Sequence, residues 1–167
     1  MLPINQFNYL NQSNCIEIEG VDDCNDFEQL KGAFECLGME DEYQQVIYKI
    51  VASVLHIGNI QFTNNNDNIT IHNTNTIKIV SELLEIDNAM LEKVLLQRKM
   101  EIKGQITIIP LKYEQSIDAR DALAKTLYYK LFQWIVNFIS LKLSSSLSTS
   151  TIGILDIFGF VSFLIIH

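Results

Sequence analysis

The amino-acid sequence predicts a mainly α-helical protein with a few strands. In segments 40–60 and 114–143, apolar side chains recur at the spacing of one helix face, and no proline interrupts them. Around Gly104, segment 98–113 changes to the alternating period that is typical of strands. Segment 152–167 is a short apolar run of the kind that fits a strand buried on both faces.

Length and hydrophobic content limit the size of the core, and the net charge argues against nucleic acid and anionic membranes as partners. A chain of 167 residues with 48% hydrophobic content can build one modest core, or one layer of something larger. Its 20 Asp and Glu residues outnumber its 12 Lys and Arg residues, which gives a net charge of -8. This charge repels nucleic acid and anionic membranes, so we expect neither as a partner.

The cysteines, histidines and N-terminal segment favour a reducing, cytoplasmic environment. The three cysteines form no CxxC pair, and the three histidines lack the spacing of metal ligands. The first ten residues have no basic stretch followed by an apolar run, so they do not resemble a secretion signal.

A short helix is predicted at 24–37. Asp22 and Asp23 offer side-chain oxygens as N-caps, and Gly38 follows as a left-handed terminator. The apolar face of this helix consists of Phe27, Leu30, Phe34 and Leu37.

A longer helix is predicted at 40–60, with acids in its first turn, where the helix dipole favours them, and Gly58 at its end. The polar segment 63–68 that follows has no apolar residue to bury, so we expect a solvated loop there. The apolar stripe of the helix consists of Val46, Ile47, Ile50, Val51, Val54 and Leu55.

Two amphipathic segments, 76–86 and 89–97, predict an α-hairpin that is broken at Asp87 and Asn88, which can cap the second helix. Segment 98–113 then predicts a β-hairpin or a projecting loop, and Pro110 argues against a central strand there.

The C-terminal part of the chain predicts a long helix and a strand. Segment 114–143 has a broad apolar stripe and no Gly or Pro, so we expect a helix that is buried along much of its length. A serine-rich joint at 144–150 separates it from the apolar run 152–167. That run is too short to span a bilayer, which needs about 20 apolar residues, and it contains Asp156.

Four stretches of this sequence, in the same order, resemble the myosin motor head. They are FNYLNQSNC at 7–15, VLHIGNIQF at 54–62, RDALAKTLYYKLFQWIV at 120–136 and LDIFGF at 155–160. The resemblance covers nearly the whole chain and implies part of an α/β motor domain. Residues 1–150 would form a portion of its helical upper subdomain, and residues 151–167 a switch II-like strand of the central sheet with a truncated tail.

The resemblance implies a nucleotide-sensing role for switch II-like residues at the end of that strand. In a complete head the carboxylate of Asp156 would hold a magnesium-bound water, so this residue is the metal candidate. The amide of Gly159 could approach a phosphate oxygen because glycine has no Cβ. The expected nucleotide-sensing residues are Asp156, Ile157, Phe158, Gly159 and Phe160.

By position, segment 98–112 corresponds to a loop of the myosin head that touches actin. Its cations form a basic spot in an acidic chain, and actin has an acidic surface. The family has an acidic or phosphorylatable residue sixteen positions before the Asp of its DALAK stretch, whereas this chain has Gln105 there. An amide cannot be phosphorylated, so we expect no phosphorylation control at this position. The candidate actin-binding residues are Arg98, Lys99, Glu101, Lys103, Gly104, Gln105 and Lys112.

ATP and Mg²⁺ are the cofactors that the resemblance implies for the complete motor domain. The 167 residues contain no GxxxxGK[ST] phosphate loop, and Val161 stands where the family has a glutamate after GF. We therefore expect no ATP hydrolysis, and no cofactor, for this fragment alone. It would keep at most a residual contact with the actin filament, in the cytoplasm and in association with the cytoskeleton, and it could pair with the remainder of a motor head.

An alternative is an unrelated helical interaction module. In that interpretation the segment TLYYKLFQWIVNFI at 126–139 would form a docking face, and LDIFGF would belong to an ordinary core.

Overall fold

The structure is a computed structural model that describes residues 2–66, 68–102 and 104–144. Within these ranges the fold is mainly helical with two small antiparallel sheets, which confirms the predicted fold class. The helices are η1 (Ile4–Gln6), α1 (Asp23–Cys36), α2 (Asp41–Gly58), α3 (Thr74–Leu84), α4 (Asn88–Leu96) and α5 (Tyr113–Leu143). The strands are β1 (Phe62–Asn65), β2 (Asn68–Ile71), β3 (Gln97–Ile102) and β4 (Gln105–Pro110).

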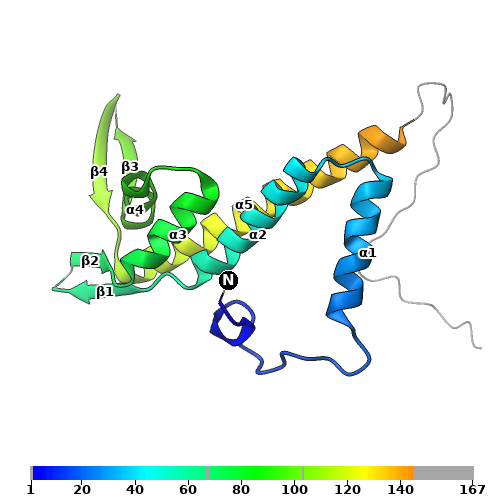
Figure 1. Ribbon diagram of the computed structural model, residues 1–167. Helices are drawn as coiled ribbons and strands as arrows, with labels where there is room; N and C mark the ends of the chain where they lie inside the picture. Colours follow the sequence, from blue (N-terminus) through cyan, green and yellow to red (C-terminus); the bar gives the residue numbers. More distant parts are fainter. Residues whose placement is uncertain (1, 67, 103, 145–167) are drawn as a thin grey trace, which may run out of the picture.

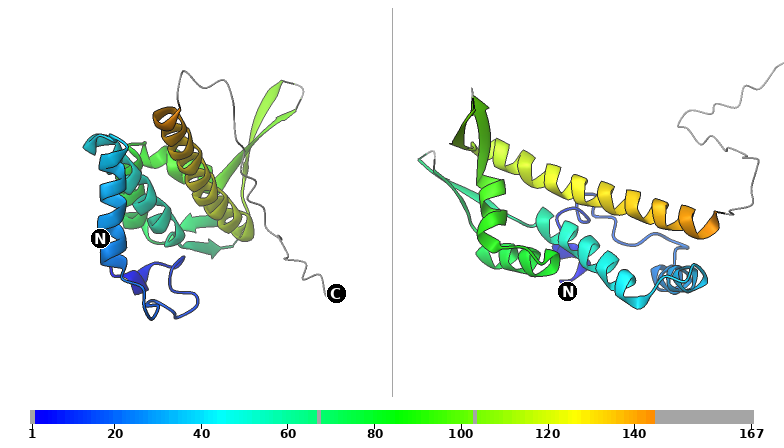
Figure 2. Two further views of the ribbon diagram at one scale, coloured as in Figure 1. Left: turned by 90° about the vertical axis from the view of Figure 1, so that its right-hand side faces the viewer. Right: turned by 90° about the horizontal axis from the view of Figure 1, so that it is seen from above.

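Helices α2 and α5 form the spine of the molecule, running side by side in opposite directions (Figures 1 and 2). Helix α3 packs against α2, and α4 packs against both α3 and α5. Both hairpins, β1–β2 and β3–β4, lie at the end of the spine where α5 begins, whereas α1 crosses the opposite end (Figure 1).

The main core lies where α2, α3, α4, α5 and the β1–β2 hairpin meet. Ile57, Ile60 and Ile77 are fully buried there. Burying one such side chain stabilises a fold by roughly 1.5–3 kcal/mol, so this cluster holds the hairpin end of the spine together. A smaller cluster joins α1 to the far end of the spine through Phe34, Met39, Ile47 and Leu131.

Short-range capping signals are confirmed. The Asp22 side chain accepts hydrogen bonds from the backbone amides of Cys24 and Asn25, both at 3.1 Å, and Gly38 follows α1 at a φ of +62°. The Asp87 side chain accepts a hydrogen bond of 2.9 Å from the Met90 amide at the start of α4. These bonds satisfy amides that have no partner within their own helix.

The prediction of a loop at 63–68 is wrong, although Asn64, Asn65, Asn66 and Asn68 are exposed to solvent as predicted. The described residues of this segment belong to the β1–β2 hairpin, whose strands pair from Phe62 with Ile71 to Asn65 with Asn68. Phe62 and Ile69 are buried in the main core, and this burial holds the polar residues between them in strand pairing. Asn66 supplies the tight connection with a φ of +52°.

The predicted burial of the long helix is also wrong, although the helix itself is confirmed. Of the residues in α5, the buried ones are Ser116, Ala124 and Leu131. Tyr128 and Phe132 remain 59% and 54% exposed. The physical reason is that α5 packs mainly on α2, with α4 and β1 beside it only near its start, so much of its apolar stripe has no neighbour among the described residues.

Ser144, the first residue of the predicted serine-rich joint, is the C-cap of α5. The rest of the joint, the predicted C-terminal strand and the division at residue 151 lie outside the described residues. Among the helices of the described ranges, none is both long and apolar enough to cross a membrane.

Candidate functional site

The β3–β4 hairpin is built on a rigid base. Helix α4 continues directly into β3, and the Leu111 amide donates a hydrogen bond of 2.8 Å to the Leu96 carbonyl where the two strands return. At the other end Gly104 has a φ of +80°, a conformation that glycine adopts without strain. The hairpin therefore projects from the molecule, as Figures 1 and 2 show.

The predicted cations of this hairpin are exposed and start from different faces of it. In the register Arg98 pairs with Ile109 and Lys99 with Ile108, so the two cations lie on opposite faces of the ribbon. Lys112 lies beyond the hairpin, immediately before α5, where its amide donates to the Gln115 side chain at 3.0 Å. Lys103 lies outside the described residues.

The other predicted loop residues lie toward the hairpin tip. Glu101 is exposed and, two residues along β3, shares a face with Lys99. Gln105 is exposed at the start of β4, beside Gly104. Their roles remain predictions.

The sequence interpretation missed two exposed isoleucines on the hairpin. Ile106 and Ile108 of β4 are 67% and 59% exposed, and the register places them opposite Glu101 and Lys99 on one face. The alternation of segment 98–113 contained part of this signal, because it places Ile106 and Ile108 on the same face of β4. The hairpin thus presents apolar surface beside charge, a composition suited to a protein partner.

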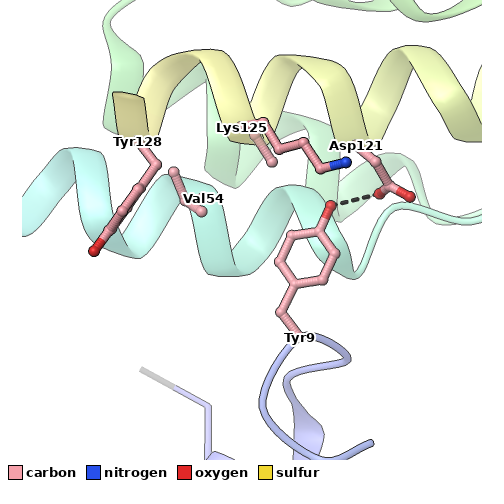
Figure 3. Close-up of a pocket in the computed structure, with 6 residues that line it drawn as sticks. Tyr9, Val54, Asp121, Lys125 and Tyr128 are labelled. Carbon is pink, nitrogen blue, oxygen red and sulfur yellow. Dashed lines mark hydrogen bonds between the residues drawn. The ribbon is translucent and has the colours of Figure 1, made fainter. Parts of the chain in front are cut away.

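A second cluster ties the N-terminal segment to the spine. The Tyr9 hydroxyl donates a hydrogen bond of 2.5 Å to Asp121 Oδ1, and Arg120 Nε donates to the same oxygen at 2.8 Å. Arg120 Nη1 also donates to the Ile60 carbonyl at 3.1 Å. Figure 3 shows the Tyr9 ring reaching from the N-terminal segment to Asp121 of α5, with Val54 and Tyr128 lining the same cavity of about 350 Å³.

The hydrogen bonds within this cluster shift the pKa of each of its three side chains. Burial and the hydrogen bond to Asp121 raise the pKa of Tyr9 to about 12. Burial works against the Asp121 carboxylate, but the hydrogen bonds from Arg120 and Tyr9 outweigh it and lower the pKa of Asp121. Burial likewise opposes the Arg120 cation, and the hydrogen bond and charge of Asp121 outweigh that effect and raise the pKa of Arg120. At neutral pH the cluster holds a neutral phenol and an ion pair.

Next to Tyr9, Phe7 and Asn8 fasten the same segment to the end of α2. Phe7 is buried with its ring 5.2 Å from that of His56 in an edge contact, and burial lowers the pKa of His56. The Asn8 amide donates to Asn59 Oδ1 at 2.8 Å, and the Asn8 side chain donates to the Gly58 carbonyl at 3.0 Å. The stretches at 7–15, 54–62 and 120–136 therefore meet in space.

The predicted nucleotide-sensing residues, 156–160, lie outside the described residues. Within the ranges that the structure describes, no group of three or more His, Cys, Asp or Glu side chains could hold a metal ion. The proposed magnesium contact of Asp156 therefore stays a prediction.

The family model described as "Myosin head (motor domain)" matches residues 1–165, nearly the whole chain. The chain belongs to the myosin head family. This assignment confirms the resemblance and rules out an unrelated helical module. Most aromatic residues of 126–139 are nevertheless exposed, with Tyr129 57% and Trp134 39% accessible to solvent, whereas Phe138 packs against the smaller cluster.

Three relatives illustrate the match to myosin. The chain is 44% identical over 163 residues to "Myosin-I heavy chain" of Dictyostelium discoideum. The aligned region covers 94% of this chain and 7% of that protein. It is 39% identical to "Myosin-1" of Coprinopsis cinerea, over 93% of this chain and 13% of the relative. It is 36% identical to "Unconventional myosin-Ic" of Danio rerio, over 94% of this chain and 16% of the relative. The chain thus corresponds to a small part of the length of each of these myosins.

Proposed function

We propose that this part of a myosin motor domain contacts the actin filament, and that the β3–β4 hairpin is its contact element. One observation carries the proposal. A hairpin with a fixed base projects from the spine and presents Lys99 beside the exposed Ile106 and Ile108. Actin is proposed as the partner because the chain belongs to the myosin head family, and myosins as a family move on actin.

Charge explains why the contact would be local and sensitive to salt. The chain as a whole carries a net charge of -8, which repels an acidic filament at long range. Arg98 and Lys99 form no ion pair within the described residues, so their charge is available to a partner. Exposed charges are screened beyond about 8 Å at physiological ionic strength, so we expect binding to weaken as salt rises.

ATP and Mg²⁺ belong to the complete motor domain in this proposal. Asp156 and Gly159 would lie at the γ-phosphate there, and this chain alone would not hydrolyse ATP. The proposal also places the protein in the cytoplasm with the actin cytoskeleton. Turnover of ATP by the purified chain, with no other protein added, would contradict the part that concerns hydrolysis.

Co-sedimentation with filamentous actin tests the contact. We expect the Arg98→Glu/Lys99→Glu variant to bind several-fold more weakly than the unaltered chain, with a smaller dependence on salt. The control is Lys130→Glu, which reverses an exposed cation on α5 away from the hairpin. Equal binding by the unaltered chain and both variants would contradict the hairpin as the contact.

A further inference from the structure

A groove separates the β3–β4 hairpin from the outer face of α4. It holds about 390 Å³, and three of its lining side chains are apolar. Met90, Val94 and Ile108 are 61%, 50% and 59% exposed, although Met90 and Val94 stand one turn apart on a helix whose other face is buried in the core. The groove is therefore an apolar surface that no described residue covers.

Cations surround this apolar floor. Lys93 of α4 and Arg98 and Lys99 of β3 line the same groove, although Arg98 and Lys99 start from opposite faces of the ribbon. None of the three forms an ion pair with a described residue, although acids outnumber bases in the whole chain. Three uncompensated positive charges around exposed methyl and thioether groups favour a ligand that is both apolar and acidic.

The shape of the surface favours a protein segment over a nucleic acid. A phosphate backbone would neutralise Lys93, Arg98 and Lys99 but would leave the side chains of Met90 and Val94 in water. A segment with apolar side chains flanked by Asp or Glu would bury the apolar floor and pair with the cations at once. Burial of the apolar floor adds a favourable term that pairing of the charges alone does not supply.

We propose that this groove docks a surface segment of the actin subunit that the hairpin contacts, and that α4 is therefore part of the filament-binding surface. The inference rests on the proposed function, because Lys99 and Ile108 belong both to the hairpin and to the groove. The segment that enters the groove presents apolar side chains beside carboxylates. Met90 and Val94 are its apolar contacts, and Lys93 joins Arg98 and Lys99 in pairing with its acids.

A matched pair of valines tests the role of α4. Val94 lies in the groove and is 50% exposed, whereas Val46 lies on α2 outside it and is 49% exposed. Val94→Glu places a carboxylate among the cations and removes apolar contact surface, and Val46→Glu makes the same chemical change elsewhere. Both sites are exposed helix positions and glutamate favours helix, so thermal melting of the two variants should agree.

Co-sedimentation of the full chain with filamentous actin gives the readout. We expect Val94→Glu to weaken binding by roughly fivefold to tenfold and Val46→Glu to leave it within about twofold. If Arg98→Glu/Lys99→Glu weakens binding but the two valine variants bind alike, the groove proposal is overturned and the proposed function stands.

Two other results would also overturn the groove proposal. If none of the variants changes binding, the proposed function fails together with it. If Val94→Glu abolishes self-association in analytical ultracentrifugation while filament binding is unchanged, the occupant is a second copy of this chain.

Discussion

Tyr9 and Asp121, separated by 112 residues in the chain, share a hydrogen bond of 2.5 Å that joins the N-terminal segment to α5. Arg120 donates to the same carboxylate oxygen and also to the Ile60 carbonyl at the end of α2. One side-chain cluster therefore holds three elements together where the stretches typical of the myosin head meet. Because the base of the β3–β4 hairpin lies at the start of α5, this cluster fixes the platform from which the hairpin projects.

Replacing Tyr9 with phenylalanine should lower the free energy of unfolding by about 1.5–3 kcal/mol, the range for a hydrogen bond to a charged group. The ring stays in place, so the change removes the hydroxyl and leaves Asp121 with Arg120 as its partner. Urea unfolding measures the loss. Tyr128→Phe is the control, because Tyr128 is 59% exposed and should lose less than about 0.5 kcal/mol. Equal stability of Tyr9→Phe and the unaltered chain would show that this bond contributes nothing.

The raised pKa of Tyr9 predicts a loss of stability at alkaline pH. Its pKa rises from 10.0 to about 12 on folding, so the folded state holds the phenolic proton more tightly than the unfolded state does. The contribution is complete below pH 10.0 and is lost as pH rises through about 12. Between these limits the unaltered chain should lose more stability than Tyr9→Phe in parallel urea titrations. Parallel pH profiles for the two proteins would refute the assignment.

The Asp87 cap predicts a cost at the start of α4, the helix that leads into the hairpin. Asp87→Ala removes the acceptor for the Met90 amide, so we expect a loss of about 1 kcal/mol in the free energy of unfolding. Asp87→Asn is the matched control, because asparagine is an equally good N-cap. Thermal or urea unfolding compares the three proteins. If asparagine and alanine destabilise equally, the charge near the helix dipole matters and the cap does not.

Features that depend on near neighbours in the sequence could be predicted, and those that depend on distant contacts could not. Asp22, Asp87 and Gly104 act within a few residues, and each stands where its chemistry predicted. The strands around Asn66 were missed because their pairing depends on burial of Phe62 and Ile69 in a core formed by other elements.

The candidate sites follow the same division. Lys99 was found because charge is visible in composition, whereas exposure of Ile106 and Ile108 depends on the hairpin projecting free of the core. An apolar stripe shows that α5 can be buried but not which element covers it. The Tyr9 and Asp121 pair was missed because no local pattern links residues so far apart.

Gly58 should be the least replaceable glycine of the described helices. A Cβ added there would lie 2.7 Å from the Tyr9 ring, whereas one at Gly32 in α1 would meet nothing within 4 Å. Alanine has a better helix propensity than glycine by about 1 kcal/mol, so Gly32→Ala should raise stability. Gly58→Ala should instead lower it by roughly 1–3 kcal/mol, because the Tyr9 ring must move and its bond to Asp121 must lengthen or break.

A double-mutant cycle separates the clash at Gly58 from effects confined to the helix end. In a Tyr9→Ala background the ring is absent, so Gly58→Ala should cost much less than it does in the unaltered chain. Urea unfolding of the two single variants and the double variant gives the coupling energy. Additive losses would mean that Gly58 matters for the end of α2 and not for the approach of Tyr9. A large coupling would place Gly58, Tyr9 and Asp121 in one unit that holds the N-terminal segment against the spine.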